Sequence, residues 1–143
     1  MDLNLINIYS GLKELFSDEK RITIYNTGIS DKEEVISFLD GGTGSRIGND
    51  GNLKIKTVFI YKLELEKVTF LKLDIEGNEI QALNGAAETI KRDKPKLAIC
   101  VYHKIDDIWR IPLYIKNLVP EYKIYIRHHR KNSCFETVCY ATL

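Results

Sequence analysis

Two continuous apolar stretches dominate the hydrophobic pattern of the chain. Residues 68–73 and 97–102 are nearly all apolar, and an amphipathic stretch of helical periodicity separates them. Continuous apolar runs are typical of strands that are buried on both faces of a parallel sheet. The pattern therefore predicts a strand–helix–strand unit, in which Asn78 caps the helix and Pro95 ends it.

The segment that precedes this unit carries shorter patterns. Apolar residues at helical spacing predict a helix over residues 5–16. A β-prone run predicts a strand over residues 21–25, and alternation of apolar and polar residues predicts strands over 35–39 and 53–61. Because a polar, glycine-containing loop joins the last two, we expect a β-hairpin with a long connection.

The last part of the chain carries one helix pattern and two strand patterns. A helix is predicted over residues 105–118, and Pro112 is expected to disturb its course. The strand patterns at 122–127 and 136–142 have only a polar turn between them. These elements predict one α/β domain spanning residues 1–143, with a mostly parallel sheet that ends in an antiparallel hairpin.

Composition changes this picture only by exclusion. The net charge of +1 gives no field for gripping a phosphate backbone, and no apolar run approaches the ~20 residues that cross a bilayer. The N-terminus lacks the features of a signal peptide. Because Cys100, Cys134 and Cys139 form no Cys-x-x-Cys pair, neither a disulfide framework nor a cysteine zinc site is indicated. We expect a reduced, cytoplasmic protein that binds neither nucleic acid nor membrane.

The most informative polar residues follow directly after the first buried strand. Asp74 and Glu76 lie between this strand and the helix, and His103 follows the second strand. Ligands of open parallel sheets bind at the carboxyl ends of the strands, where two carboxylates can orient a cation, share a proton or accept a hydroxyl hydrogen bond. His103 is a candidate base at the same edge. The alternative is that both carboxylates only stabilise the start of the helix.

The three histidines do not indicate a metal site. His128 and His129 are adjacent, so on a strand they point to opposite faces and at most one of them can join His103. No further spacing of zinc ligands supports such a site. The basic cluster at residues 127–131 is either a solvated turn or a contact for an anionic substrate.

An ordered series of motifs resembles methyltransferases of the FkbM family. Residues 72–79 match the Lys-x-Asp-x-Glu-Gly-x-Glu pattern of that family. Each motif alone is unspecific, whereas the ordered series covers nearly the whole chain from about residue 20. The further matching segments are Asn26–Asp31, Gly42–Arg46, Leu83–Ala86, Lys94–Ile99, Val101–Lys104, Tyr125–His128 and Glu136–Ala141.

The resemblance implies a class I, Rossmann-like methyltransferase fold and an S-adenosylmethionine-dependent O-methyltransferase. The implied acceptor is a sugar or another small hydroxylated molecule. By this resemblance the catalytic candidates are Asp74, Glu76 and His103. The cofactor-binding candidates are Gly28, Ile29, Ser30 and Asp74, of which the first three are placed near the adenine. The substrate-binding candidates are Ser45, Arg46 and His128.

The sequence departs from the family pattern on its N-terminal side. A complete member begins with a strand and an Asp-x-Gly-x-x-x-Gly loop, and neither is found before Leu5. Residues 42–44 do not replace this loop, because a strand pattern rather than a helix follows them. We interpret the chain as an N-terminally truncated domain that binds S-adenosylmethionine weakly or not at all. We expect either a homodimer through an unpaired strand edge or a rearranged sheet that closes the gap. The alternative is a non-catalytic remnant that serves as an interaction or oligomerisation module.

Overall fold

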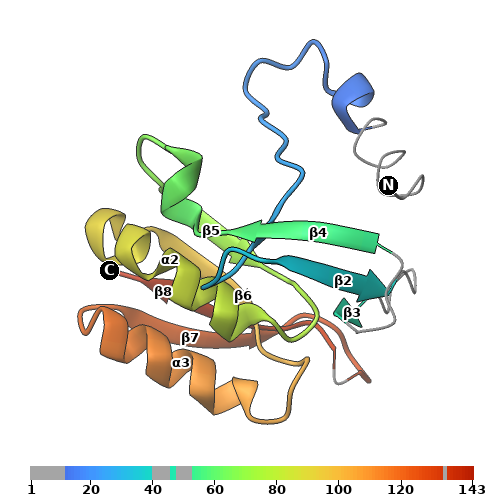
Figure 1. Cartoon of the computed structure of the whole chain (residues 1–143). Coiled ribbons are helices and arrows are strands. Elements are labelled where there is room, and N and C mark those ends of the chain that lie inside the picture. Colours follow the sequence, from blue (N-terminus) through green and yellow to red (C-terminus); the bar gives the residue numbers. More distant parts are fainter. Residues whose placement is uncertain (1–11, 40–45, 48–52, 134) are drawn as a thin grey trace. The chain divides into compact units, whose positions relative to one another are not determined.

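The computed structural model describes residues 12–39, 46–47, 53–133 and 135–143. The chain divides into two compact units, one made of residues 1–28 and 33–58, the other of residues 29–32 and 59–143. Both are seen in Figure 1. Together they contain two sheets and a small set of helices, so the chain is a mixed α/β protein.

The first unit holds an antiparallel sheet. Strand β2 (Val35–Leu39) pairs with β4 (Leu53–Val58) and with the short β3 (Arg46–Ile47). With β1 (Gly28–Ile29), the strand order is β1-β4-β2-β3. The predicted β-hairpin with a long connection is therefore confirmed, although residues 40–45 and 48–52 of the connection lie outside the described residues.

Three elements expected in the N-terminal half differ from the structure or lie partly outside the described residues. Residues 12–15 are helical, while residues 5–11 of the predicted helix lie outside the described residues. The strand predicted over residues 21–25 is wrong: the segment is not extended in a sheet, and Arg21 instead donates to the Glu19 carboxylate over 2.6 to 2.9 Å. β-propensity produces a strand only where a partner strand is available. Similarly, the second hairpin strand stops early, because Ile60–Leu63 form the 3₁₀ helix η2.

The second unit is built on a four-stranded sheet of mixed direction. Its strands are β5 (Phe70–Leu73), β6 (Lys96–Cys100), β7 (Lys123–His128) and β8 (Thr137–Thr142), in the order β5-β6-β8-β7. The pair β5/β6 is parallel, and β8 is antiparallel to both β6 and β7. The predicted parallel pair and the terminal hairpin are confirmed. Within this four-stranded sheet, however, β5/β6 is the one parallel pairing, so the sheet is not mostly parallel.

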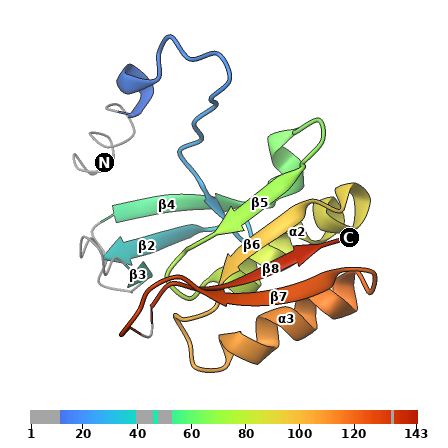
Figure 2. The same cartoon turned by 180° about the vertical axis from the view of Figure 1, so that it is seen from behind.

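Two helices lie against the same face of this sheet, as Figures 1 and 2 show. Helix α2 (Glu79–Asp93) connects β5 to β6, and α3 (Asp107–Leu118) follows β6. Asn78 is the N-cap residue of α2, as predicted, but its side chain makes no capping bond; its Nδ2 instead donates to the Ile75 carbonyl at 3.3 Å. Within the described residues, no helix is both long and apolar enough to span a membrane.

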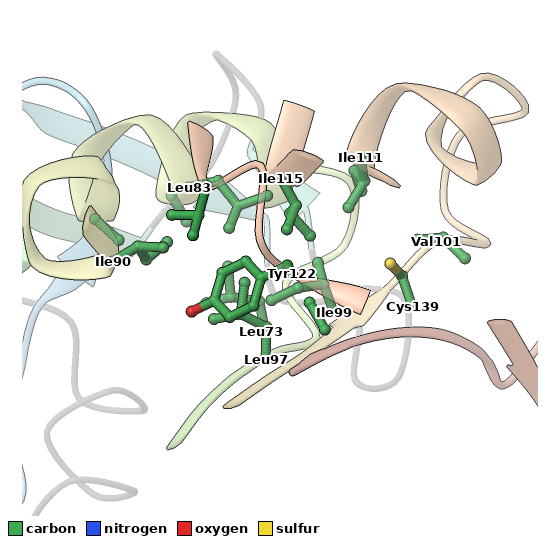
Figure 3. Packing of buried hydrophobic residues seen from close by; sticks show 14 of the residues in the cluster. Leu73, Leu83, Ile90, Leu97, Ile99, Val101, Ile111, Ile115, Tyr122 and Cys139 are labelled. Atoms are coloured by element: carbon green, nitrogen blue, oxygen red, sulfur yellow. The ribbon is translucent and has the colours of Figure 1, made fainter. Parts of the chain in front are cut away.

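The hydrophobic core lies between the helices and the sheet (Figure 3). Leu83 and Ile115 pack from the helices, and the hydroxyl of the buried Tyr122 donates to the Pro95 carbonyl at 2.5 Å. Two residues expected to be buried are not. Ile108, whose helical spacing predicts an inward position on α3, is 45% exposed, and Phe70 on the edge strand β5 is 57% exposed.

Gly85 allows residues 29–32 to lie directly on α2. A Cβ atom at Gly85 would lie 2.0 Å from the carbonyl oxygen of Ser30, so only glycine fits without displacing the backbone. Next to it, Nδ2 of Asn84 donates to Oδ2 of Asp31 at 3.1 Å. The Leu83–Ala86 motif therefore has a structural role, which is to hold this segment against the helix.

Candidate active site

Parallel pairing of β5 and β6 brings the three catalytic candidates together. Asp74 and Glu76 follow β5, and His103 follows β6 at the same edge of the sheet. Nε2 of His103 lies 3.5 Å from Oδ1 of Asp74 and 3.6 Å from Oε2 of Glu76. The predicted position of these side chains at one edge is therefore confirmed, while their catalytic roles stay predictions.

A left-handed turn positions Glu76. Glu76 has φ of 54° and Gly77 has φ of 90°, a region that glycine adopts readily and other residues adopt rarely. A Cβ atom at Gly77 would lie 3.0 Å from Cε of Lys104, whose Nζ donates to the Gly77 carbonyl. The glycine of the Asp-x-Glu-Gly sequence thus permits both the turn and the close approach of the segment after β6.

Glu79 belongs to the same cluster, although the sequence reasoning gave it no role. Its side chain is 0% exposed; Oε1 accepts the backbone N–H of Ile75 at 2.9 Å and lies 2.8 Å from Nδ1 of His103. An N–H on Nδ1 of His103 does not point at Oε1 closely enough for a hydrogen bond, so Nδ1 has no hydrogen-bond partner among the described residues. A signal was present in the sequence: Glu79 shares the helical stripe of Leu83, Ala86 and Ile90, where a charge must be paired.

The environment of Asp74 keeps its carboxyl group ionised. Burial raises the pKa of Asp74, but hydrogen bonds from the Cys100 thiol and the Tyr102 hydroxyl, together with the charge of Lys72, outweigh burial and lower it. The Tyr102 hydroxyl donates to Oδ1 of Asp74 at 3.1 Å. Burial and the contact with Asp74 raise the pKa of Cys100 to about 12. Asp74 can therefore accept a proton or hydrogen bond, or face a cation.

A second buried carboxyl group adds to the negative charge of the cluster. Asp107, the first residue of α3, is 2% exposed. Burial and then the charge of Glu79 raise the pKa of Asp107. Oδ2 of Asp107 and Oε2 of Glu79 are both buried and have no hydrogen-bond partner within the described part of the chain. The site as a whole therefore favours a positively charged group.

The other predicted site residues lie elsewhere or outside the described set. Ser45 is outside it, and Arg46 is described only by its backbone in β3. Gly28 forms β1 with Ile29, which packs against the core of the second unit. His128 ends β7, and its Nδ1 lies 2.8 Å from Oγ1 of Thr137. The structure thus groups Asp74, Glu76 and His103, and does not place His128 in contact with them.

Among the described residues, no group of three or more His, Cys, Asp or Glu side chains is arranged to hold a metal ion. One aromatic contact extends the site: the ring of Phe135, in the turn before β8, meets that of Tyr102 edge to face at 5.8 Å. This contact links the terminal hairpin to the hydroxyl that holds Asp74.

A polar site at the carboxyl ends of parallel strands is typical of α/β enzymes that bind a small-molecule ligand. Comparison with known proteins gives the family: the pattern of the family described as "Methyltransferase FkbM domain" matches residues 10–132, and the chain belongs to this family. No curated protein matches the chain.

A solved structure agrees with this assignment. The chain is similar to methyltransferase FkbM from Methylobacillus flagellatus KT, with 28% sequence identity and a TM-score of 0.75. The match covers 98% of this chain and 34% of that protein, so the chain spans about a third of its length. The resemblance found in the motifs is therefore confirmed.

Proposed function

We propose that the chain acts in S-adenosylmethionine-dependent O-methylation of a sugar or another small hydroxylated acceptor. The observation that carries the proposal is the convergence of Asp74, Glu76 and His103 within 3.6 Å at the edge of the β5/β6 pair. Membership of the FkbM family supports methyl transfer as the reaction. We further propose that residues 1–143 belong to one class I, Rossmann-like domain and act in the cytoplasm.

The residues present fit the positively charged end of the proposed cofactor. S-adenosylmethionine, when bound, supplies a methyl group on a cationic sulfur. The ionised carboxylate of Asp74 and the neighbouring Glu76 complement a positive charge, and both side chains are accessible to a ligand. Following the family resemblance, Ile29 and Ser30 are proposed to contact the adenine. Ser30 lies on α2 through the close approach at Gly85, and Ile29 packs against the core.

The acceptor must lose a proton as its oxygen forms the new bond to carbon. If the methyl group of bound S-adenosylmethionine passed to the acceptor oxygen, the electron pair of the broken carbon–sulfur bond would remain on sulfur, and the hydroxyl proton would pass to a base on the chain. Nε2 of His103 lies beside both exposed carboxylates and can take that proton, while Asp74 accepts the hydroxyl hydrogen bond and orients the oxygen. Because the transfer needs only an oriented acceptor oxygen and a base, correct positioning of the two reactants supplies most of the rate acceleration.

A transfer assay with isotopically labelled S-adenosylmethionine and a panel of monosaccharides, nucleotide sugars and polyols tests the proposal. The donor is used at millimolar concentration, because the sequence contains no Asp-x-Gly-x-x-x-Gly loop. Asp74→Asn is expected to lower transfer by about 10²-fold or more, the usual effect of losing a positioned acid–base group.

Asp93→Asn is the matched control for Asp74→Asn. Asp93 is also an aspartate with hydrogen-bonded oxygens, but it lies at the far end of α2, where it accepts the backbone N–H of Val68 at 2.9 Å. Its substitution is expected to leave transfer unchanged under conditions where the chain is folded. Equal rates for the two variants would refute the assignment of the site.

A further inference from the structure

Glu79 is a carboxylate in a position where a charge is costly. It is fully buried on the core-facing stripe of α2, and an ionised carboxylate in such a place needs hydrogen-bond donors or a cation. The groups that approach Oε1 are the backbone N–H of Ile75 at 2.9 Å and Nδ1 of His103 at 2.8 Å. One oxygen atom therefore touches both the loop that carries Asp74 and Glu76 and the ring that faces them.

The neighbouring cations are engaged elsewhere. Nζ of Lys104 donates to the Gly77 carbonyl, and Nζ of Lys72 lies 3.5 Å from Oδ2 of Asp74. The nearby Asp107 is a second carboxyl group and cannot neutralise Glu79; the charge of Glu79 instead contributes to the raised pKa of Asp107. The proton on His103 Nδ1 is thus the positive partner that the geometry provides for Glu79.

We infer that Glu79 is a positioning residue that holds the proton of His103 on Nδ1 and thereby leaves Nε2 to face Asp74 and Glu76. A neutral imidazole has one N–H and one lone pair, and a carboxylate can only accept. Oε1 of Glu79 lies 2.8 Å from Nδ1, whereas the carboxylate oxygens beside Nε2 are 3.5 and 3.6 Å away. The ring N–H is not aligned for a full hydrogen bond to Oε1, but this shorter contact favours the proton on Nδ1. The lone pair then lies on Nε2, which is 3.5 Å from Asp74 and 3.6 Å from Glu76, on the accessible side of the ring.

The consequence for catalysis rests on the proposed function. If a hydroxyl acceptor binds at this edge, the lone pair of Nε2 is directed at the site where its proton must leave. The side chain of His103 is only 8% exposed, and its Nδ1 lies 2.8 Å from the buried carboxylate of Glu79. The ring therefore cannot turn over freely to exchange the positions of Nδ1 and Nε2. The tautomer itself is a property of the folded chain and does not depend on any reaction.

Nitrogen-15 NMR of the full chain tests the inference directly, without substrate. Long-range proton–nitrogen spectra distinguish a protonated ring nitrogen from one that bears a lone pair. During an alkaline titration, Nε2 of His103 is expected to lose its proton while Nδ1 retains it. Loss of the proton from Nδ1, or equal populations of both tautomers, would overturn the inference. His128 and His129 serve as controls in the same spectrum, since their ring nitrogens contact hydroxyl groups rather than carboxylates.

A pair of matched variants separates positioning from a general effect of buried charge. Glu79→Gln keeps the size of the side chain but removes its charge, and it is expected to shift His103 toward a mixture of tautomers. Asp107→Asn removes a buried charge in the same region, and the tautomer is expected to stay on Nδ1. The same change in both variants would overturn the specific role of Glu79.

The outcomes also separate this inference from the proposed function. If Glu79→Gln does not fold, the spectrum of the unsubstituted chain still decides the question. The predicted tautomer in a chain without transfer activity would support the inference and count against the proposed function. Transfer activity in a chain whose His103 carries its proton on Nε2 would support the proposed function and overturn the inference about Glu79.

Discussion

Substituting Gly85 by alanine tests how residues 29–32 are held in the second unit. In the interior of an ordinary helix, Gly→Ala stabilises a protein by about 0.5–1 kcal/mol. In α2, the added Cβ would lie 2.0 Å from the Ser30 carbonyl oxygen, 2.5 Å from its carbon and 3.2 Å from the Asp31 nitrogen. A backbone clash of this kind cannot be relieved by a rotamer change, so the segment must withdraw.

The clash is expected to outweigh the gain in helix propensity. Overpacking of this kind costs about 1–3 kcal/mol. After the propensity gain is subtracted, we expect Gly85→Ala to lower the free energy of unfolding by about 1–2 kcal/mol. Amide NMR signals of Ser30 and Asp31 should also shift, because these residues lose their place on the helix.

Urea denaturation provides the measurement, with Gln81→Ala as the control. Gln81 is exposed on the same helix, so its substitution changes helix propensity without introducing a clash. A variant Gly85→Ala that equals or exceeds the unsubstituted chain in stability would show that residues 29–32 do not lie on α2 as described.

Three further predictions concern acid stability, thiol reactivity and assembly. Hydrogen bonds from the Arg92 side chain and from a backbone N–H lower the pKa of Asp93 to about 2, which is below its value in the unfolded chain. The ionised carboxylate therefore stabilises the folded chain above pH ~4, and this stabilisation is lost as the pH falls toward ~2. Asp93→Asn should therefore weaken the dependence of the melting temperature on pH between these values. An unchanged pH dependence would contradict the hydrogen bonds to Asp93. Burial raises the pKa of Cys100 and Cys139 to about 12, so in a Cys134→Ser variant thiol reagents at neutral pH should react only after unfolding. Finally, the edge strand β5 should pair with a second copy, giving a dimer by light scattering that Phe70→Lys disrupts; a monomer at all concentrations would refute this pairing.

Much of the second unit could be predicted because its patterns are continuous. The apolar runs at β5 and β6 predicted the parallel pair, although β5 is only partly buried, and the rule for strand carboxyl ends then placed Asp74 and His103 together. The terminal hairpin followed from two strand patterns joined by a turn too short for a helix.

The failures have a common physical cause, which is that tertiary contacts decide what local patterns leave open. Residues 21–25 have β-prone side chains but no partner strand among the described residues, and Ile108 on α3 is 45% exposed. Glu79 was overlooked because a glutamate at the start of a helix has an ordinary explanation in the helix dipole. Only its burial and its distance to His103 reveal the second role.

The most direct test of the account is a titration of the isotopically labelled chain with S-adenosylmethionine, followed by proton–nitrogen NMR and calorimetry. We predict weak, millimolar binding, with amide shifts concentrated at residues 74–79 and 102–104, because these segments form the polar edge of the β5/β6 pair. Shifts confined to the opposite edge around Asp93, or no shift at residues 74–79, would contradict the assignment of the site. Micromolar binding by a monodisperse monomer would contradict the expectation that donor binding is weak.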